Sequence, residues 1–448
     1  MAAKFTYIDL FAGIGGFHAA LSAMGGDCVA AVEIDPRAAT IYEMNWGTSA
    51  LADITERAND NGVRLPKHDV LVAGFPCQPF SKSGAQRGME ETRGTLYWNI
   101  LKIIEKHHPE IVLLENVRNL AGPRHVHEWE VIIETLRAEG YRVSDTPAIF
   151  SPHLLDKKHG GRPQIRERVF IAATYVGKKL SQADLEVEPP VTNKPIAGWD
   201  PQNWSLIDDL LDVHDQLPEE SLLSKEEIKW IDAWDEFVLK MLKSRKGEKL
   251  PGFPLWSDSW VLPEDLDIEE GTPGWKIDFL QKNSNFYADH QKLIDSWKAK
   301  WKVSEFPPSR RKLEWQAQDA QSLWETVMHF RPSGIRAKKA TYLPALVAIT
   351  QTSIIGPERR RLTTREAARL QGFPDSFKFD GQSPAATFKQ LGNGVNIGVV
   401  WHVLKQLAER DAKILAKRKP DLFEAISSAP LSPDSILKKM KPAARITK

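Results

Sequence analysis

The strongest constraint on the fold is an alternation of short apolar runs with helix-like segments through the first 175 residues. Apolar runs such as FTYIDL, CVAAVE, VLVAG and EIVLLE have the length of strands, and segments with helical periodicity, such as TLYWNILKIIEKHH, lie between them. Near-continuous apolar strands that alternate with helices indicate a parallel sheet with helices on both faces. The sequence therefore predicts an α/β fold with a doubly wound, Rossmann-like sheet.

The alternation stops near Ser181, and a helix pattern returns only after Gly356. Eleven of the fifteen tryptophans lie in the intervening segment, which has an acidic portion followed by a basic one. This change of composition indicates a separate domain. We predict a catalytic and cofactor-binding domain over 1–180, a second, smaller domain over 181–356, a return to the first domain over 357–410, and a basic, mobile tail over 411–448.

Composition excludes several classes of protein. The chain has 448 residues, of which 42% are hydrophobic and 27% charged, so it is neither disordered throughout nor small. A net charge of +1 excludes a uniformly basic nucleic-acid binder, and no apolar run reaches the ~18 residues that a membrane span needs. Two cysteines cannot form a disulfide framework, which favours a reducing compartment such as the cytoplasm.

The turn FAGIGG follows the first predicted strand. Gly13, Gly15 and Gly16 allow a sharp turn and a close approach to a ligand, but their spacing differs from the dinucleotide pattern G-x-G-x-x-G. Glu33 ends the second strand, where a carboxylate can accept hydrogen bonds from ribose hydroxyls. Asp53 can accept from the adenine amine in the same crevice, or can cap a helix. These residues suggest an adenosine-containing ligand such as S-adenosylmethionine, and the missing pattern disfavours a nicotinamide dehydrogenase.

The loop GFPCQPFS follows the third strand and places Cys77 at the carboxyl end of the sheet. Pro76 and Pro79 stiffen this loop around the thiol. A lone cysteine is more often buried filler than a nucleophile, and Cys28, at the start of an apolar strand, fits that description. The glycine-rich, basic segment 81–94 has the composition of a hinged lid, although an ordinary surface loop would look similar.

Two further sets of charged residues lie near the predicted sheet edge. Glu115 ends the fourth strand, where burial can raise its pKa and suit it to act as an acid. The alternative is a structural carboxylate that caps the next helix. Arg166 and Arg168 precede another strand, and one of the two is expected to face the site.

These motifs, taken in order, resemble those of bacterial-type DNA (cytosine-5) methyltransferases. The resemblance covers about 1–180 and 357–402, and the second domain resembles nothing that we can assign from sequence. Gly394 departs from the family, which more often has serine or alanine there. The matching segments are DLFAGIGGF (9–17), EIDPRA from Glu33, ADI to Ile54, GFPCQPFS (74–81), ENV (115–117), QIRERVF (164–170), RRLTTREAARLQGFPDSF (360–377) and KQLGNGVNIGVV (389–400).

The resemblance implies a role for each matched residue. Cys77 would attack C6 of a flipped-out cytosine, Glu115 would protonate N3, and Arg168 would hold O2, with Arg166 as a second candidate for that site. The implied cofactor is S-adenosylmethionine, and no metal is expected. In addition to the glycine turn, the resemblance places at the cofactor Phe11, Glu33, Ile34, Asp53, Ile54, Pro76, Leu96, Asn393 and Val395.

The implied partner is double-stranded DNA. By resemblance, Gln78, Ser81 and Arg87 lie near the DNA backbone, and the second domain reads the target sequence. Arg336, in the basic segment RPSGIRAKK, is the best candidate for a bidentate contact to guanine, although a phosphate contact or a surface loop would also suit it. The family further implies a monomer in the cytoplasm of a bacterial or archaeal cell, alongside a separate restriction endonuclease.

Two other functions are also compatible with these motifs. Relatives of these enzymes methylate cytosine in transfer RNA with similar motifs, but the long second domain favours the reading of a duplex sequence. A catalytically silent DNA-binding regulator has no chemical need for Cys77, Glu115 and Arg168 together. The sequence therefore predicts a sequence-specific DNA cytosine-5 methyltransferase of a restriction–modification system.

Overall fold

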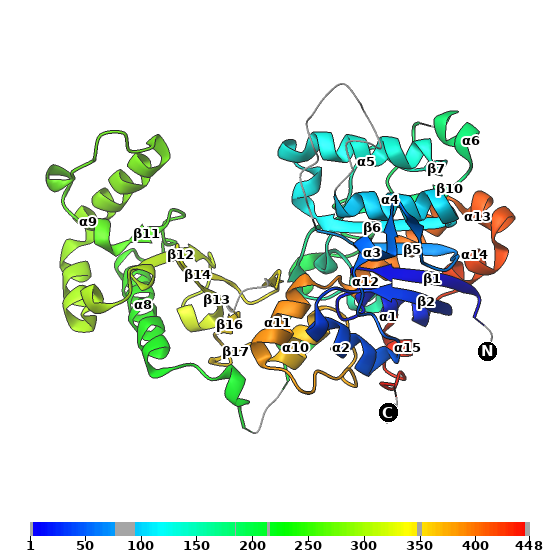
Figure 1. The fold of residues 1–448 in the computed structure, drawn as a ribbon. Helices are drawn as coiled ribbons and strands as arrows, with labels where there is room; N and C mark the ends of the chain where they lie inside the picture. The colour runs from blue at the N-terminus through cyan, green and yellow to red at the C-terminus, as the bar shows by residue number, and fades with distance from the viewer. Residues whose placement is uncertain (1–2, 77–94, 184, 213–215, 347–351, 444–448) are drawn as a thin grey trace. The chain divides into compact units, whose positions relative to one another are not determined.

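The computed structural model describes residues 3–76, 95–183, 185–212, 216–346 and 352–443. The chain divides into two compact units (Figure 1). Unit 1 comprises Met1–Leu211, Pro344–Ile349 and Thr364–Lys448, and unit 2 comprises Asp212–Leu343 and Thr350–Thr363.

Unit 1 extends beyond the boundary predicted at residue 180. The indole groups of Trp199 and Trp204 both donate hydrogen bonds to the carbonyl of His153, at 2.9 and 3.1 Å. Two of the tryptophans that suggested a separate domain therefore attach their segment to unit 1. Unit 1 continues to Leu211 for this reason.

A seven-stranded sheet forms the centre of unit 1. Six of its strands follow the order β2-β1-β5-β6-β10-β7, and β8 pairs with β10. The first four strands in this order are parallel, whereas β10 runs antiparallel to β6, β7 and β8. The predicted strand RVFIAATY is therefore present, but the sheet is mixed, because no α-helix crosses between β8 and β10 to restore the direction. The strands are β1 (Phe5–Leu10), β2 (Gly26–Val32), β5 (Val70–Gly74), β6 (Ile111–Val117), β7 (Tyr141–Arg142), β8 (Ala148–Phe150) and β10 (Arg168–Tyr175).

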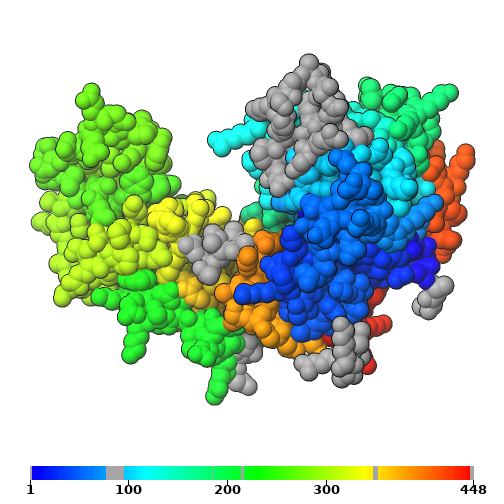
Figure 2. All heavy atoms as spheres, in the orientation of Figure 1, coloured from blue at the N-terminus to red at the C-terminus, as the bar shows by residue number. Residues whose placement is uncertain are grey.

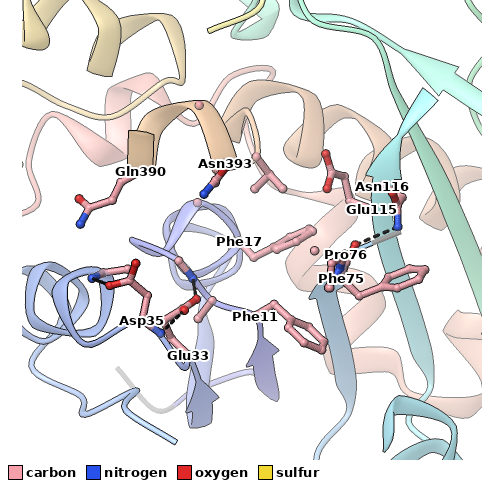
Figure 3. A pocket seen from close by; sticks show the side chains of 18 of the residues that line it. Phe11, Phe17, Glu33, Asp35, Phe75, Pro76, Glu115, Asn116, Gln390 and Asn393 are labelled. Carbon is pink, nitrogen blue, oxygen red and sulfur yellow. Dashed lines mark hydrogen bonds between the residues drawn. The ribbon is translucent and has the colours of Figure 1, made fainter. Parts of the chain in front are cut away.

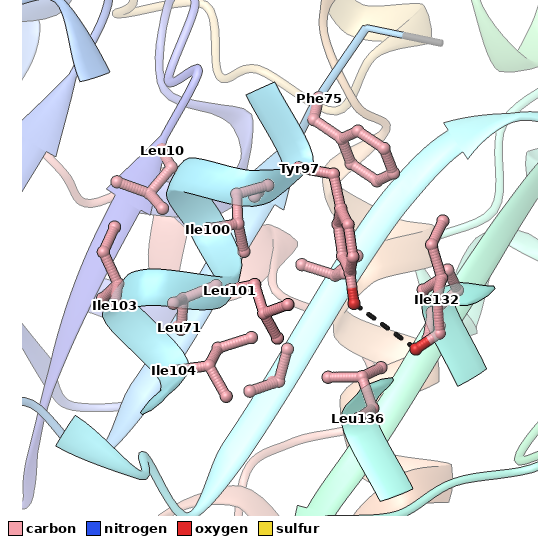
Figure 4. Packing of buried hydrophobic residues seen from close by; sticks show 14 of the residues in the cluster. Leu10, Leu71, Phe75, Tyr97, Ile100, Leu101, Ile103, Ile104, Ile132 and Leu136 are labelled. Carbon is pink, nitrogen blue, oxygen red and sulfur yellow. Dashed lines mark hydrogen bonds between the residues drawn. The ribbon is translucent and has the colours of Figure 1, made fainter. Parts of the chain in front are cut away.

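Helices cover both faces of this sheet, as the doubly wound pattern predicts. On one face, Ile8 and Leu10 of β1 pack in a cluster with α4 (Leu96–His107) and α5 (Val126–Ala138) (Figure 4). On the other face, the Tyr7 hydroxyl forms a 2.7 Å hydrogen bond with the hydroxyl of Ser22, which belongs to α1 (Gly16–Ala23). Each large aliphatic side chain in the first cluster stabilises the fold by about 2–5 kcal/mol relative to alanine.

The C-terminal segment differs from the predicted mobile tail. Residues 412–437 contain three helices, α13 (Ala412–Arg418), α14 (Pro420–Ser427) and α15 (Asp434–Leu437). Their apolar side chains are buried, including Leu415, Leu422 and Leu437, which are at most 1% exposed. Burial of these leucines outweighs the basic composition on which the tail prediction was based.

Unit 2 has a six-stranded sheet that packs against two long helices, α8 (Lys225–Ser244) and α9 (Gly274–Trp301). Ser224 and Glu227 form a capping box at the start of α8, which satisfies two backbone N–H groups there. Tryptophans at the centre of the core, such as Trp234 and Trp297, account for the tryptophan-rich composition. The strand order is β11 (Leu255–Trp256), β12 (Lys312–Gln316), β14 (Gly334–Lys339), β13 (Thr326–Arg331), β16 (Ile354–Ile355) and β17 (Arg360–Arg361).

No helix among the described residues is both long enough and apolar enough to cross a membrane.

Candidate active site

A cavity of about 500 Å³ lies at the carboxyl ends of the parallel strands of unit 1. The glycine turn and the strand ends of β5 and β6 form part of its wall, and the C-terminal end of α11 (Pro384–Asn393) forms another part. In Figure 2, the orange residues that include α11 lie beside the blue N-terminal residues, which are far away in the sequence. This is the edge of the sheet at which α/β proteins bind their ligands.

Nine of the predicted site residues line this cavity. Figure 3 shows Glu33 near one end of the cavity and Glu115 near the other, with the aromatic rings of Phe11 and Phe17 between them. An elongated cavity with a carboxylate at each end can hold one ligand beside a second reacting group. The nine residues are Phe11, Gly13, Gly16, Glu33, Pro76, Glu115, Arg168, Asn393 and Val395.

The glycine turn requires two of its glycines for steric reasons. Gly15 has φ of 92°, and a Cβ atom there would lie 2.1 Å from the Trp46 indole nitrogen. A Cβ atom on Gly16 would lie 2.7 Å from the side chain of Val395. Gly15 shapes the turn without lining the cavity, whereas Gly16 lets the cavity wall around Val395 approach closely.

Glu33 closes the turn from the neighbouring strand end. One of its carboxylate oxygens accepts a hydrogen bond from the backbone N–H of Gly13 at 2.8 Å, and the other accepts from the N–H of Asp35 at 2.7 Å. Each oxygen keeps a further lone pair for a ligand hydroxyl. Glu33 therefore lies at the edge of the cavity with lone pairs to offer to a ligand, which is the geometry that a contact with ribose hydroxyls requires.

Besides Gly15, four predicted cofactor residues do not line the cavity. Asp53 is the N-cap of α3 (Ile54–Arg57), and its carboxylate accepts from the backbone N–H and the hydroxyl of Thr55, each at 2.8 Å. Ile34 is 67% exposed, whereas Ile54 is buried and Leu96 packs against the hydrophobic cluster of α4 and α5. Asp53 therefore takes the helix-capping role that the sequence left open.

Glu115 and Arg168 form an ion pair at the cavity. Neighbouring strands β6 and β10 carry them, and Arg168 Nε lies 3.0 Å from Glu115 Oε1. Burial raises the pKa of Glu115, and the charges of Arg168 and Arg166 partly oppose this rise. A buried carboxyl group with a raised pKa is suited to hold a proton and donate it to a bound base.

Arg166 lies behind the cavity wall. It is 2% exposed, and its guanidinium donates hydrogen bonds to the carbonyls of Gly392 at 2.8 Å, Gly394 at 2.6 Å and Leu346 at 3.2 Å. Burial lowers the pKa of Arg166 to about 9. Its N–H groups are directed at backbone carbonyls, so Arg166 holds residues 392–394, which form part of the cavity wall. The predicted contact of Arg166 with the substrate base is therefore wrong.

Other predicted residues lie outside the described part of the chain. These are Cys77, Gln78, Ser81 and Arg87. The last described residue before them, Pro76, lines the cavity. The carbonyl of the preceding Phe75 accepts a 2.8 Å hydrogen bond from the side chain of Asn116.

Sequence reasoning missed several residues that line the cavity. Phe17 and Asn116 belong to matched motifs but were given no role. Lys389 and Gln390 precede Asn393 by four and three positions, so helical spacing on α11 could have indicated a shared face. Asp35 is the N-cap of α2 (Pro36–Trp46) and also lines the cavity.

Comparison with known sequences gives consistent matches. The family model described as C-5 cytosine-specific DNA methylase matches residues 5–409. Type II methyltransferase M.AluI of Cellulosimicrobium cellulans is 48% identical, over 92% of this chain and 94% of that protein. Type II methyltransferase M.HpaII of Haemophilus parainfluenzae is 28% identical, over 91% of this chain and 90% of that protein.

Comparison with solved structures gives matches of low sequence identity and low TM-score. A putative DNA modification methyltransferase encoded within a prophage of E. coli is 20% identical, with a TM-score of 0.44 over 90% of this chain and 98% of that one. The S. pombe Dnmt2 methyltransferase is 17% identical, with a TM-score of 0.44 over 90% and 98% of the two chains.

Proposed function

We propose that this chain, which belongs to the C-5 cytosine-specific DNA methylase family, methylates C5 of cytosine at a specific sequence in double-stranded DNA, with S-adenosylmethionine as the methyl donor. The observation that carries this proposal is the Glu115–Arg168 pair at one end of a cavity that has Glu33 near its other end. Sequence-specific methylation of DNA cytosine is the activity that the family match and the type II relatives support.

The cavity suits S-adenosylmethionine in size and chemistry. Its volume of about 500 Å³ lies within the range of small-molecule sites. Glu33 would accept hydrogen bonds from the ribose hydroxyls, and Phe11 would offer an aromatic surface to the adenine. Gly16 leaves room for the wall formed by Val395. When bound, this cofactor supplies an electrophilic methyl group on a sulfonium ion.

The chemistry at the other end of the cavity would begin on the target cytosine. The Cys77 thiolate forms a bond to C6 while the C5–C6 double bond opens, and Glu115 transfers its proton to N3. Arg168 donates a hydrogen bond to O2 and keeps a cation beside Glu115 after the carboxyl group has lost its proton. C5 would thereby become nucleophilic toward the methyl group that the cofactor supplies, with S-adenosylhomocysteine as the leaving group. Loss of the C5 proton to water and departure of the thiolate would restore the aromatic ring, and the proton on N3 would return to Glu115.

This reaction requires the cytosine to leave the duplex, because its ring must face a thiol and a methyl donor. We assign target recognition to unit 2, with Arg336 at a guanine edge, and contacts with the DNA backbone to Gln78, Ser81 and Arg87. We further propose that the enzyme acts as a monomer in the bacterial or archaeal cytoplasm, and that a separate restriction endonuclease recognises the same sequence.

The decisive test is cytosine-conversion sequencing of plasmid DNA from cells that express the protein. The wild-type protein should protect cytosines in one short sequence motif, and Cys77→Ala should protect none, because it lacks the nucleophile. Cys28→Ala is the matched control and should retain protection, since burial raises the pKa of the Cys28 thiol to about 12 and makes it unreactive. Protection by Cys77→Ala would refute the mechanism. Absence of protection by a folded wild-type protein would refute the DNA substrate and direct attention to transfer RNA.

A further inference from the structure

The sheet of unit 2 has one apolar face and one polar face. Leu313 and Trp315 of β12, Ile335 of β14 and Met328 of β13 belong to the hydrophobic core of unit 2. Side chains alternate along a strand, so the residues between them point to the opposite face.

The strand registers define the members of this polar face. Glu314 of β12 is paired with Arg336 of β14, and His329 of β13 is paired with the same arginine. Directly paired residues share a face, and so do residues two positions apart in one strand. The central face therefore has the polar residues Lys312, Glu314, Gln316, His329, Arg331, Arg336 and Lys338, together with the buried Val327, which is paired with Lys338.

Positive charge is in excess on this face. It has four lysine or arginine side chains and only one carboxylate, that of Glu314. Lys338 has no hydrogen bond or ion pair with any described residue. Burial lowers the pKa of Lys338, and the charges of Arg336 and Arg331 lower it further. Glu314 compensates part of the charge of Arg331 and Arg336, with which it forms ion pairs. The positive charge that remains on this face suits a polyanion.

Glu314 is held in place by three neighbouring side chains, of which Arg331 places its Nη1 3.8 Å from Glu314 Oε2. Its Oε1 accepts a hydrogen bond from the Ser333 hydroxyl at 2.9 Å. Its Oε2 lies 2.6 Å from both Nε and Nη2 of Arg336. One edge of the Arg336 guanidinium is therefore occupied by Glu314, while no residue in the described part of the chain accepts from the two parallel N–H groups at its far end. Two parallel N–H donors match O6 and N7 of guanine in the major groove.

We propose that this polar face contacts double-stranded DNA, where Lys338 binds a backbone phosphate and Glu314 holds the Arg336 guanidinium toward a guanine edge. The inference rests on the proposed function, because it takes DNA as the substrate. Glu314 is a positioning residue: it acts through Arg336 and does not itself read the base. Lys338 strengthens binding to DNA of any sequence, whereas the Glu314–Arg336 pair confers sequence preference.

A salt titration tests the phosphate contact, with two neighbouring lysines as a matched pair. Lys339 is on the opposite face and is paired with Asp319 at 2.6 Å, so Lys338→Gln and Lys339→Gln change the net charge equally. The probe is a 20-base-pair duplex that contains the methylated sequence. For Lys338→Gln, the slope of log affinity against log salt should fall by about 0.9 relative to wild type. For Lys339→Gln, the slope should stay at the wild-type value. Equal slopes for the two variants would overturn the phosphate contact.

Sequence preference tests the positioning role of Glu314. Wild-type methylation of the cognate duplex is compared with methylation of duplexes in which one guanine–cytosine pair at a time is replaced. Glu314→Gln should reduce the preference by about tenfold at a single position, because its neutral amide holds Arg336 more weakly. Arg336→Ala should affect the same position. A uniform loss of activity at every sequence would indicate a merely structural role for Glu314 and overturn its assignment.

These outcomes are separable from a failure of the proposed function. If the wild-type protein methylates no DNA cytosine, the proposed function fails before either variant is examined. If it methylates DNA but the two lysine variants show equal slopes and Glu314→Gln keeps its preference, only the inference about this face fails. Tighter binding to a folded RNA than to the DNA duplex would overturn the choice of DNA as the partner.

Discussion

Arg166 illustrates how a residue that does not line the cavity can control the shape of the cavity. Its three backbone acceptors, Gly392, Gly394 and Leu346, are at least 180 positions away in the sequence. Two of them flank Asn393 in the cavity wall, so the guanidinium fixes the position of that wall. Lysine at this position would keep the charge, but its ammonium group lacks the planar arrangement of N–H donors with which the guanidinium reaches these carbonyls.

We therefore expect Arg166→Lys to weaken the binding of S-adenosylhomocysteine by tenfold or more, as measured by calorimetry. Arg162→Lys is the control, since Arg162 bonds to the carbonyl of Arg369 and to Asp434 and does not line the cavity. The control should bind like wild type. If Arg166→Lys also did so, the 392–394 wall would not depend on this guanidinium.

The sequence correctly placed residues at the cavity where a residue lies at or just after the end of a strand. Glu33 follows β2, and Glu115 lies near the carboxyl end of β6, so the topology alone brings both carboxylates to one sheet edge. The placements of Ile34 and Ile54 came from motif matching and have no such support, and neither residue lines the cavity. The role of Arg166 could not be predicted, because its partners are brought together only by the complete fold.

At the scale of elements, the C-terminal helices show how a short apolar pattern can be hidden by basic composition. The main strands and helices of the first 175 residues were predictable because each has an uninterrupted apolar run or a helical apolar spacing, whereas short strands such as β7 and β8 have neither and were not predicted. The direction of β10 was not, since it depends on the connection before it rather than on the residues within it. The tail prediction was wrong for 412–437 because net charge was considered without the spacing of Leu415, Leu422 and Ile426.

Two leucines of this segment test whether it is part of the folded core. Leu437, in α15, is 1% exposed, whereas Leu431 is 59% exposed. Leu437→Ala should lower the free energy of unfolding by about 2–5 kcal/mol in urea denaturation. Leu431→Ala should change it by less than about 0.5 kcal/mol. Equal changes in the free energy of unfolding would mean that this segment does not pack against the rest of unit 1.

At the scale of the whole molecule, buried histidines make stability depend on pH. Burial lowers the pKa of His18 to about 3, and it lowers the pKa values of four others to about 4. The unfolded chain takes up protons at these sites below about pH 6.5, whereas the folded chain does not. Buried Asp9 and Glu115 change the pH dependence of stability in the opposite direction, because burial raises their pKa values and the folded chain then binds their protons more tightly than the unfolded chain does. The other four histidines are His68, His153, His329 and His402.

We expect the free energy of unfolding to be greatest above about pH 6.5 and to decrease from there toward pH 4. Each such histidine contributes a slope of up to about 1.4 kcal/mol per pH unit. His68→Asn should reduce the total slope by about this amount, because asparagine can replace the His68 hydrogen bond to the Pro66 carbonyl without titrating. Urea denaturation at several pH values measures the slope. A curve that is flat between pH 6.5 and 4.5 would contradict the expectation.

The walls of the cavity come from distant parts of the chain, and this has a consequence for the order of events on the ribosome. Strands β1, β2, β5 and β6 emerge within the first 117 residues, but the wall around Asn393 and Val395 is made only after all of unit 2. Domains fold as they emerge during synthesis, N-terminal parts first. The nascent chain therefore has most of its central sheet long before the wall around Asn393 and Val395 can complete the cavity.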